Sequence, residues 1–295
     1  MERYSRQLLV IGIEAQEKLK KTRVAIVGCG ALGTGIAELL ARLGVGFIRL
    51  IDADYVELSN LSRTHLFEES DIYKPKAMVC YEKVKKINPE VTIEPIIDVI
   101  NPENALKYLS DVDYVFDATD NVLTRLIIND ACVMLNKPLI YGGVSGLYGS
   151  VKLVVPYKSA CLSCFLNYNG DDTNACEVIG VVDTITSVVA SLEVQEFLNH
   201  LMNQDKNGEE LIYVDLKELS FEKIKIERNP YCEACSRKEF VYLKKNYTVN
   251  ACIPTEVSEP KGSPVISNEW LRIYKTTGGV IVCYNNGKCF KRVVR

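Results

Sequence analysis

The chain has 295 residues, of which 47% are hydrophobic and 25% charged, and its formal net charge is −3. This composition is typical of a globular protein and excludes a disordered or collagen-like chain. The sequence has no apolar run of membrane-spanning length and does not start like a secretory signal peptide. We therefore expect a cytoplasmic protein that does not enter a membrane.

The first predicted elements form a nucleotide-binding unit. Residues 2–21 are predicted to form one or two helices, followed by a strand at Val24–Val27, a glycine turn at 28–33, a helix, and a strand at Phe47–Ile51 that leads to Asp52. The glycines let the backbone approach a phosphate, the helix amides attract the anion, and Asp52 lies where ribose hydroxyls bind. By itself this fingerprint favours an NAD-dependent oxidoreductase.

Strands and helices continue to alternate as far as residue 155. The predicted helices are 74–87, a short one after Pro102, and 122–135; the predicted strands are 91–97, 114–118, 138–141 and 150–155. This order indicates a Rossmann-like, doubly wound α/β sheet, mostly parallel, with helices on both faces. Because ligands bind at the carboxyl ends of such strands, we expect four polar residues to converge there. They are Asp52, Asp54, Asp120 and Asn121.

Eleven cysteines is a high and odd number, which argues against a disulfide framework in a reducing compartment. Two CxxC pairs, Cys161 with Cys164 and Cys232 with Cys235, frame one long segment. Four thiolates at these spacings favour a closed tetrahedral Zn²⁺ site with a structural role. The alternatives are two redox CxxC motifs or coincidence.

The last part of the chain differs in character. After a long apolar helix predicted at 178–202 and β structure at 213–226, prolines mark an irregular stretch near 254–264. Short alternating runs around an Asn-Gly turn then predict a small β-rich module. Residues 236–295 carry eleven Lys or Arg and four Glu, a balance of +7, whereas the preceding residues carry −10. The basic tail is either a solvated surface or a docking face for an acidic partner.

Several motifs occur together in a recognisable order. They are RYSRQ at 3–7, GCGALG at 28–33, DADYVELSNLSR at 52–63, KPK at 74–76, DATDN at 117–121 and the two CxxC pairs. With them the sequence resembles the adenylyltransferases that activate ubiquitin-like and sulfur-carrier proteins, including the molybdopterin-synthase and thiamin-biosynthesis enzymes and ubiquitin-activating enzymes. The likeness covers roughly residues 2–236, so we expect an adenylation domain at 1–236 with the zinc knuckles and a small basic domain at 237–295.

The resemblance implies that ATP and Mg²⁺ are used to adenylate the C-terminal glycine of a carrier protein that ends in Gly-Gly. It assigns the ribose to Asp52, the phosphates to Arg63 and Lys76, placement of the nucleotide to Asn60, and Mg²⁺ to Asp120. The other candidate nucleotide contacts are Gly28, Gly30, Ala31, Gly33, Asp54 and Asn121.

Two further roles follow from the resemblance. Arg6 reaches the neighbouring subunit's site, which implies a homodimer. Cys176 occupies the place of a crossover-loop cysteine that takes the carrier as a thioester or persulfide-linked adduct in some members and is dispensable in others. Its sequence position before a predicted helix would favour a thiolate. The ordinary alternative is an idle or buried cysteine.

Each candidate also has an alternative without function. Arg6, Arg63 or Lys76 alone would be a solvated surface charge, and Asp120 could be the N-cap of the helix that begins near Val122. An inert partner subunit is the non-enzyme alternative to the whole assignment. For the activated carrier, two fates remain open: sulfur transfer, or passage to a conjugating enzyme recruited by the C-terminal module. We expect no direct binding of nucleic acid.

Overall fold

The computed structural model describes residues 2–168, 180–203, 207–244 and 254–292. The larger sheet consists of β1 (Arg23–Val27), β2 (Phe47–Ile51), β3 (Thr92–Ile96), β4 (Tyr114–Asp117), β5 (Leu139–Ser145), β6 (Tyr148–Val154), β7 (Glu210–Asp215) and β8 (Ser220–Lys225). The main helices are α1 (Ser5–Lys21), α2 (Ala31–Leu43), α3 (Lys76–Ile87), α4 (Ala105–Leu109), α5 (Val122–Leu135), α7 (Asp183–Met202) and α8 (Val241–Lys244). Short 3₁₀ helices cover Glu2–Tyr4, Leu58–Asn60, Glu69–Asp71 and Leu162–Cys164.

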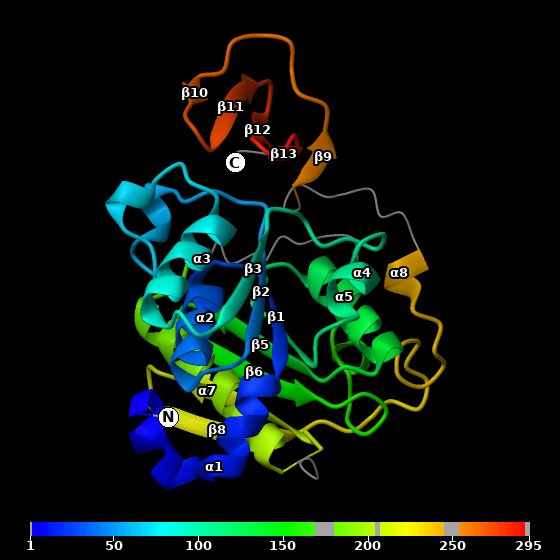
Figure 1. Cartoon of the computed structure of the whole chain (residues 1–295). Coiled ribbons are helices and arrows are strands. Elements are labelled where there is room, and N and C mark those ends of the chain that lie inside the picture. Colours follow the sequence, from blue (N-terminus) through cyan, green and yellow to red (C-terminus); the bar gives the residue numbers. More distant parts are fainter. Residues whose placement is uncertain (1, 169–179, 204–206, 245–253, 293–295) are drawn as a thin grey trace.

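The eight strands lie in the order β3-β2-β1-β4-β5-β6-β7-β8 (Figure 1). The first five pair in parallel, as predicted, but β6, β7 and β8 continue the sheet antiparallel. The change of direction occurs because only Gly146 and Leu147 separate β5 from β6. So short a connection can join only antiparallel neighbours, since a parallel pair needs a crossover. The sheet is therefore mixed, and the predicted α/β fold is confirmed.

Both faces of the sheet are covered by helices, as predicted. Along β1 the side chains alternate, so that Val24 and Ile26 pack with α2, α3 and α7, whereas Ala25 and Val27 pack with α4 and α5. This alternation is the two-residue period of an extended strand. Within the described ranges, no helix combines the length and the apolar character needed to cross a membrane.

A second sheet confirms the predicted β-rich module, which we call the tail module (residues 255–292). It comprises β9 (Thr255–Val257), β10 (Ile266–Ser267), β11 (Leu271–Thr276), β12 (Gly279–Tyr284) and β13 (Cys289–Arg292), in the order β10-β11-β12-β13-β9. Figure 1 shows it above the edge of the larger sheet from which the loops after β1 and β2 emerge.

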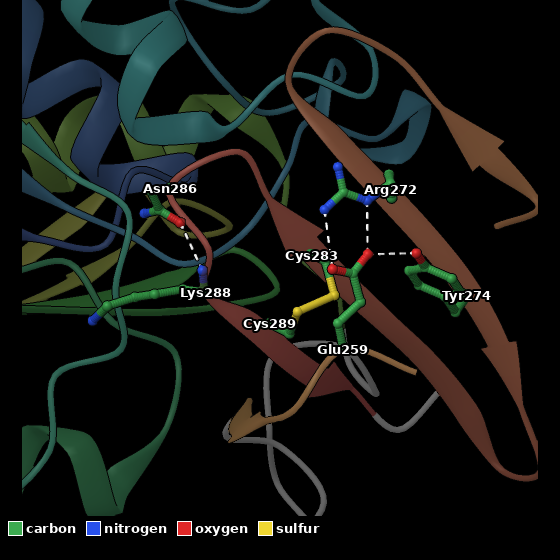
Figure 2. Close-up of a disulfide and its surroundings, with 7 residues drawn as sticks. All are labelled: Glu259, Arg272, Tyr274, Cys283, Asn286, Lys288 and Cys289. Atoms are coloured by element: carbon green, nitrogen blue, oxygen red, sulfur yellow. Dashed lines mark hydrogen bonds and ion pairs between the residues drawn. A yellow bond between two sulfur atoms is a disulfide. The ribbon is translucent and has the colours of Figure 1, made fainter. Parts of the chain in front are cut away.

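A disulfide joins β12 to β13 inside the tail module. Cys283 and Cys289 are directly opposite in the antiparallel register, with their Cα atoms 4.0 Å apart (Figure 2). No role for either cysteine follows from the sequence motifs. In the same view, the Glu259 carboxylate accepts hydrogen bonds from Arg272 and from the Tyr274 hydroxyl.

The segment before the tail module belongs to the larger body. Phe240 and Leu243 pack in the core cluster of α4 and α5, and the Tyr242 amide donates to Asp130 Oδ2 at 2.9 Å. Residues 237–244 therefore lie with the α/β sheet. The domain boundary at residue 236 stays a prediction.

Candidate functional site

A cavity of about 540 Å³ opens at the carboxyl ends of β1, β2 and β4, and we call it the strand-end cavity. Ten of the residues predicted to bind or process a nucleotide line it. They are Gly28, Gly30, Ala31, Asp52, Asp54, Asn60, Arg63, Lys76, Asp120 and Asn121. The expected convergence arises because parallel strands place all their carboxyl ends at one edge of the sheet.

The glycine turn needs its glycines for different physical reasons. Gly28 has φ +95°, and a Cβ there would lie 2.5 Å from the Ala118 carbonyl oxygen. A Cβ on Gly33 would lie 1.9 Å from the Gly28 oxygen, so Gly33 permits helix α2 to pack against the turn rather than lining the cavity. Nothing lies within 4 Å of a Cβ built on Gly30, which leaves the backbone there open to a ligand. Since α2 begins at Ala31, its N-terminal amides would face an anion bound at this turn.

Asp52 is held in a fixed orientation at the end of β2. Its Oδ2 accepts a hydrogen bond from the Cys29 amide at 2.6 Å and its Oδ1 accepts one from the Asp54 amide at 2.6 Å. Burial raises the pKa of Asp52, and the nearby Lys76 only partly offsets this shift. The carboxylate is thus oriented before any ligand arrives.

Lys76 is a buried cation that lines the cavity. Its Nζ lies 3.1 Å from Asp54 Oδ2, and its amide donates to the Asp54 carbonyl at 2.8 Å. Burial lowers the pKa of Lys76, but the carboxylates of Asp54 and Asp52 outweigh this, and the net pKa is raised. Lys76 is therefore a permanent positive charge at neutral pH, not a proton donor or acceptor.

The loop after β2 positions two more of the predicted residues. Asn60 is buried, and its Oδ1 accepts a hydrogen bond from the Glu57 amide at 3.0 Å. Arg63 donates from Nη1 to the Ser59 carbonyl at 2.7 Å, which ties its guanidinium to the same turn. Both side chains line the cavity, Asn60 from the 3₁₀ helix Leu58–Asn60 and Arg63 from the turn that follows it.

Asp120 is not the cap of the helix that follows it. The N-cap of α5 is Asn121, whose Oδ1 accepts from the Thr124 amide at 2.8 Å. Asp120 is exposed on the cavity wall, where a carboxylate is a suitable ligand for Mg²⁺. The capping alternative for Asp120 is therefore wrong.

Two arginines in the cavity wall were not among the predicted residues. Arg125 lies one turn into α5, donates to the Thr119 carbonyl at 2.6 Å, and stands 4.0 Å from Asp117. An arginine inside the largely apolar run VLTRLII was the available sequence signal. Arg292, from the tail module, is the second, and no local pattern distinguishes it from neighbouring basic residues.

Two of the predicted functional residues, Arg6 and Cys176, remain to be placed. Arg6 is exposed on α1 and does not line the cavity of its own chain. Cys176 lies outside the described residues.

The four CxxC cysteines come together as predicted. The Sγ atoms of Cys161 and Cys232 are 3.6 Å apart, those of Cys164 and Cys235 are 3.5 Å apart, and all four lie within 4.8 Å of one another. A tetrahedral zinc with Zn–S bonds of about 2.3 Å requires sulfur atoms about 3.8 Å apart. The cluster therefore fits Zn²⁺, and four protein ligands leave no open coordination position.

Comparison with known proteins finds a matching family, sequence relatives and a similar solved structure. The model of the ThiF family matches residues 4–234. The sulfur carrier protein ThiS adenylyltransferase of Bacillus subtilis is 36% identical over 257 residues, covering 85% of this chain and 76% of that protein. The molybdopterin-synthase adenylyltransferase of Escherichia coli is 32% identical over 242 residues, covering 80% and 97% respectively. The crystal structure of E. coli MccB with MccA-N7isoASN matches with a TM-score of 0.70 at 27% identity, over 79% of this chain and 74% of that one.

Proposed function

The chain belongs to the ThiF family and is an adenylyltransferase, and from this premise we propose that it uses Mg-ATP to adenylate the C-terminal carboxylate of a sulfur-carrier protein. The observation that carries the proposal is the strand-end cavity, where fixed cations and carboxylates surround a helix N-terminus. The relatives' names support a sulfur carrier as the second substrate. An oxidoreductase would leave Arg63, Lys76 and the cysteine cluster without a role.

The reaction joins two anions. A carboxylate oxygen of the carrier attacks the α-phosphorus of ATP, the bond from that phosphorus to the bridging oxygen breaks, and pyrophosphate leaves. The enzyme's task is to position the reactants and to stabilise charge on the phosphate oxygens. We assign the ribose to Asp52 and the phosphates to Arg63 and Lys76. Asp120 would hold Mg²⁺, which neutralises phosphate charge when bound.

The direct test is carrier-dependent exchange between ATP and pyrophosphate. We expect the purified protein to incorporate labelled pyrophosphate into ATP only when a small carrier protein ending in Gly-Gly is present. The control is the same carrier without its last two residues, which offers no correctly placed carboxylate. Absence of exchange with every carrier encoded by the source organism would contradict the proposal.

We further propose that the enzyme works as a homodimer in which Arg6 serves the partner's site. Helix α1 carries large apolar side chains that its own chain leaves exposed, namely Leu9 at 81%, Val10 at 85% and Ile13 at 64%. Such a patch on a helix is typical of a protein–protein interface. Arg6 lies on the same helix and away from the cavity of its own chain.

Hybrid dimers test this assignment. Arg6→Ala and Lys76→Ala homodimers should each be inactive in exchange, because every site lacks one cation. A hybrid isolated with two affinity tags should regain about half of the wild-type activity, since one of its two sites then has both Arg6 and Lys76. If Arg6 acted within its own subunit, both sites of the hybrid would be damaged and no activity would return.

The next proposal concerns what happens to the carrier protein after it has been adenylated. The sulfur-carrier relatives favour a path in which the adenylate is converted to a thiocarboxylate, over transfer to a conjugating enzyme.

For the cysteine cluster we propose a structural Zn²⁺ held by Cys161, Cys164, Cys232 and Cys235. It would tie the segment after β6 to the loop after β8.

A further inference from the structure

Arg292 brings the tail module into the strand-end cavity. Its Nε lies 3.2 Å from Asp54 Oδ1 and its Nη2 lies 3.3 Å from Asp54 Oδ2. Two guanidinium nitrogens therefore lie beside the two carboxylate oxygens. Its Nη1 also lies 3.4 Å from Glu57 Oε1. Arg292 is far beyond residues 4–234, which the family model matches. The family's shared residues therefore do not include this cation.

The position of Arg292 is fixed by docking of the whole module. Ala53 and Tyr55, from the loop after β2, share a buried apolar cluster with Val282, Tyr284 and Phe290. The Tyr284 hydroxyl donates to the Ala53 carbonyl at 2.6 Å.

Further contacts hold the module at its edges. Lys288 pairs with the buried Asp98, and Asn268 donates to the Tyr73 carbonyl at 3.0 Å. The Arg292 guanidinium also stands over the Tyr55 ring, 5.3 Å from its centre. Apolar burial, hydrogen bonds and ion pairs thus all place β13 against the cavity.

The positive charge of Arg292 compensates carboxylates that line the strand-end cavity. Asp54 and Glu57 both line the cavity, and two uncompensated carboxylates would repel the phosphates of ATP. Lys76 pairs with Asp54 but not with Glu57. Although burial raises the pKa of Asp54, Lys76 and Arg292 together bring it below its usual value, so the carboxyl is ionised at neutral pH. Arg292 is thus a second cation on Asp54 beside Lys76, and it also lies next to Glu57.

We propose that Arg292 is a positioning residue for adenylation, which neutralises Asp54 and Glu57 so that the strand-end cavity accepts a polyanionic nucleotide and Lys76 stays available to its phosphates. The tail module is thereby a part of the nucleotide site. This inference rests on the proposed function insofar as the cavity binds ATP.

The test is calorimetric titration of the full chain with Mg-ATP. Arg292→Met removes the charge but keeps an apolar stem beside Tyr55, and we expect it to weaken ATP binding about tenfold. Arg292→Lys should restore most of the affinity. Arg272→Met is the matched control, because Arg272 pairs with Glu259 in the same module, away from the cavity (Figure 2); it should change affinity less than about twofold.

A second substitution, Glu57→Gln, separates an effect of the Arg292 charge from an effect of Arg292 on the docking of the tail module. If Arg292 acts by neutralising carboxylates, Glu57→Gln in the Arg292→Met protein should recover about half or more of the lost binding free energy. Trp270, the single tryptophan of the chain, packs beside the docking cluster, so its emission reports whether the module stays seated. Recovery with the emission unchanged throughout supports the role of charge, whereas recovery that occurs only as a shifted emission returns would overturn it in favour of seating of the module.

The outcomes are distinct. Failure of the wild-type chain to bind Mg-ATP would overturn the nucleotide assignment of the cavity itself. Wild-type binding with unchanged affinity in Arg292→Met would overturn the role of Arg292 alone. A loss in Arg292→Met that neither Glu57→Gln nor Arg292→Lys recovers would also overturn it.

Discussion

Lys76→Ala should reduce carrier-dependent ATP–pyrophosphate exchange at least about 100-fold, the usual effect of removing a fixed group that stabilises developing charge. Lys76 is a buried cation of the strand-end cavity, where its charge is less screened by water than that of an exposed side chain. The fold should survive, because Arg292 still pairs with the Asp54 carboxylate that Lys76 would leave behind. The measurements are the exchange rate and the thermal midpoint of the same preparation.

Lys74→Ala is the matched control for this substitution. Lys74 lies two residues earlier in the same KPK motif, pairs with Asp71 at 3.1 Å, and does not line the cavity. It loses the same charge, so a purely long-range effect of net charge would appear in both variants. Exchange within a few-fold of wild type in Lys76→Ala would show that the phosphates bind elsewhere.

Loss of the metal should produce the largest effect on stability. We expect about one zinc per chain by elemental analysis, and none after Cys161→Ser. A structural four-thiolate zinc contributes directly to folding free energy, because the unfolded chain has no preformed site. If the loss costs about 5 kcal/mol, the thermal midpoint of a chain of 295 residues falls by roughly 8 °C. A strong chelator should lower the midpoint of the wild-type protein in the same direction.

Cys132→Ala serves as the control for the cysteine substitution. Cys132 is buried on α5 in the same core cluster as Cys161 and Cys232, but is not one of the four clustered thiols. It should keep its zinc and lose only the small free energy of one buried sulfur. Metal-free wild-type protein, with disulfides found by mass spectrometry among the four cysteines, would instead support the redox alternative.

Local sequence patterns were sufficient to predict most of the helices and strands of the α/β body. The strand–turn–helix unit with its glycines, the helix at 122–135 and the Asn-Gly hairpin were predicted because each depends on neighbours in sequence. The antiparallel extension was missed, because the strand predicted at 138–141 continues to Ser145 and reverses at Gly146. The direction of β6 could not be predicted while β5 was expected to end at Tyr141, because only the two-residue connection between β5 and β6 forces them to pair antiparallel.

What the sequence by itself determined is the set of residues at the strand ends. Asp52, Asp54 and Asp120 each come shortly after a predicted strand, and a parallel sheet must bring such positions to one edge. What only the tertiary structure decided is the last wall of the cavity. Arg292 meets Asp54 across 238 residues, and that meeting depends on how the apolar face of the tail module packs on the loop after β2. Side-chain packing between distant elements leaves no periodic trace in either segment, and so it has to be seen in the folded chain.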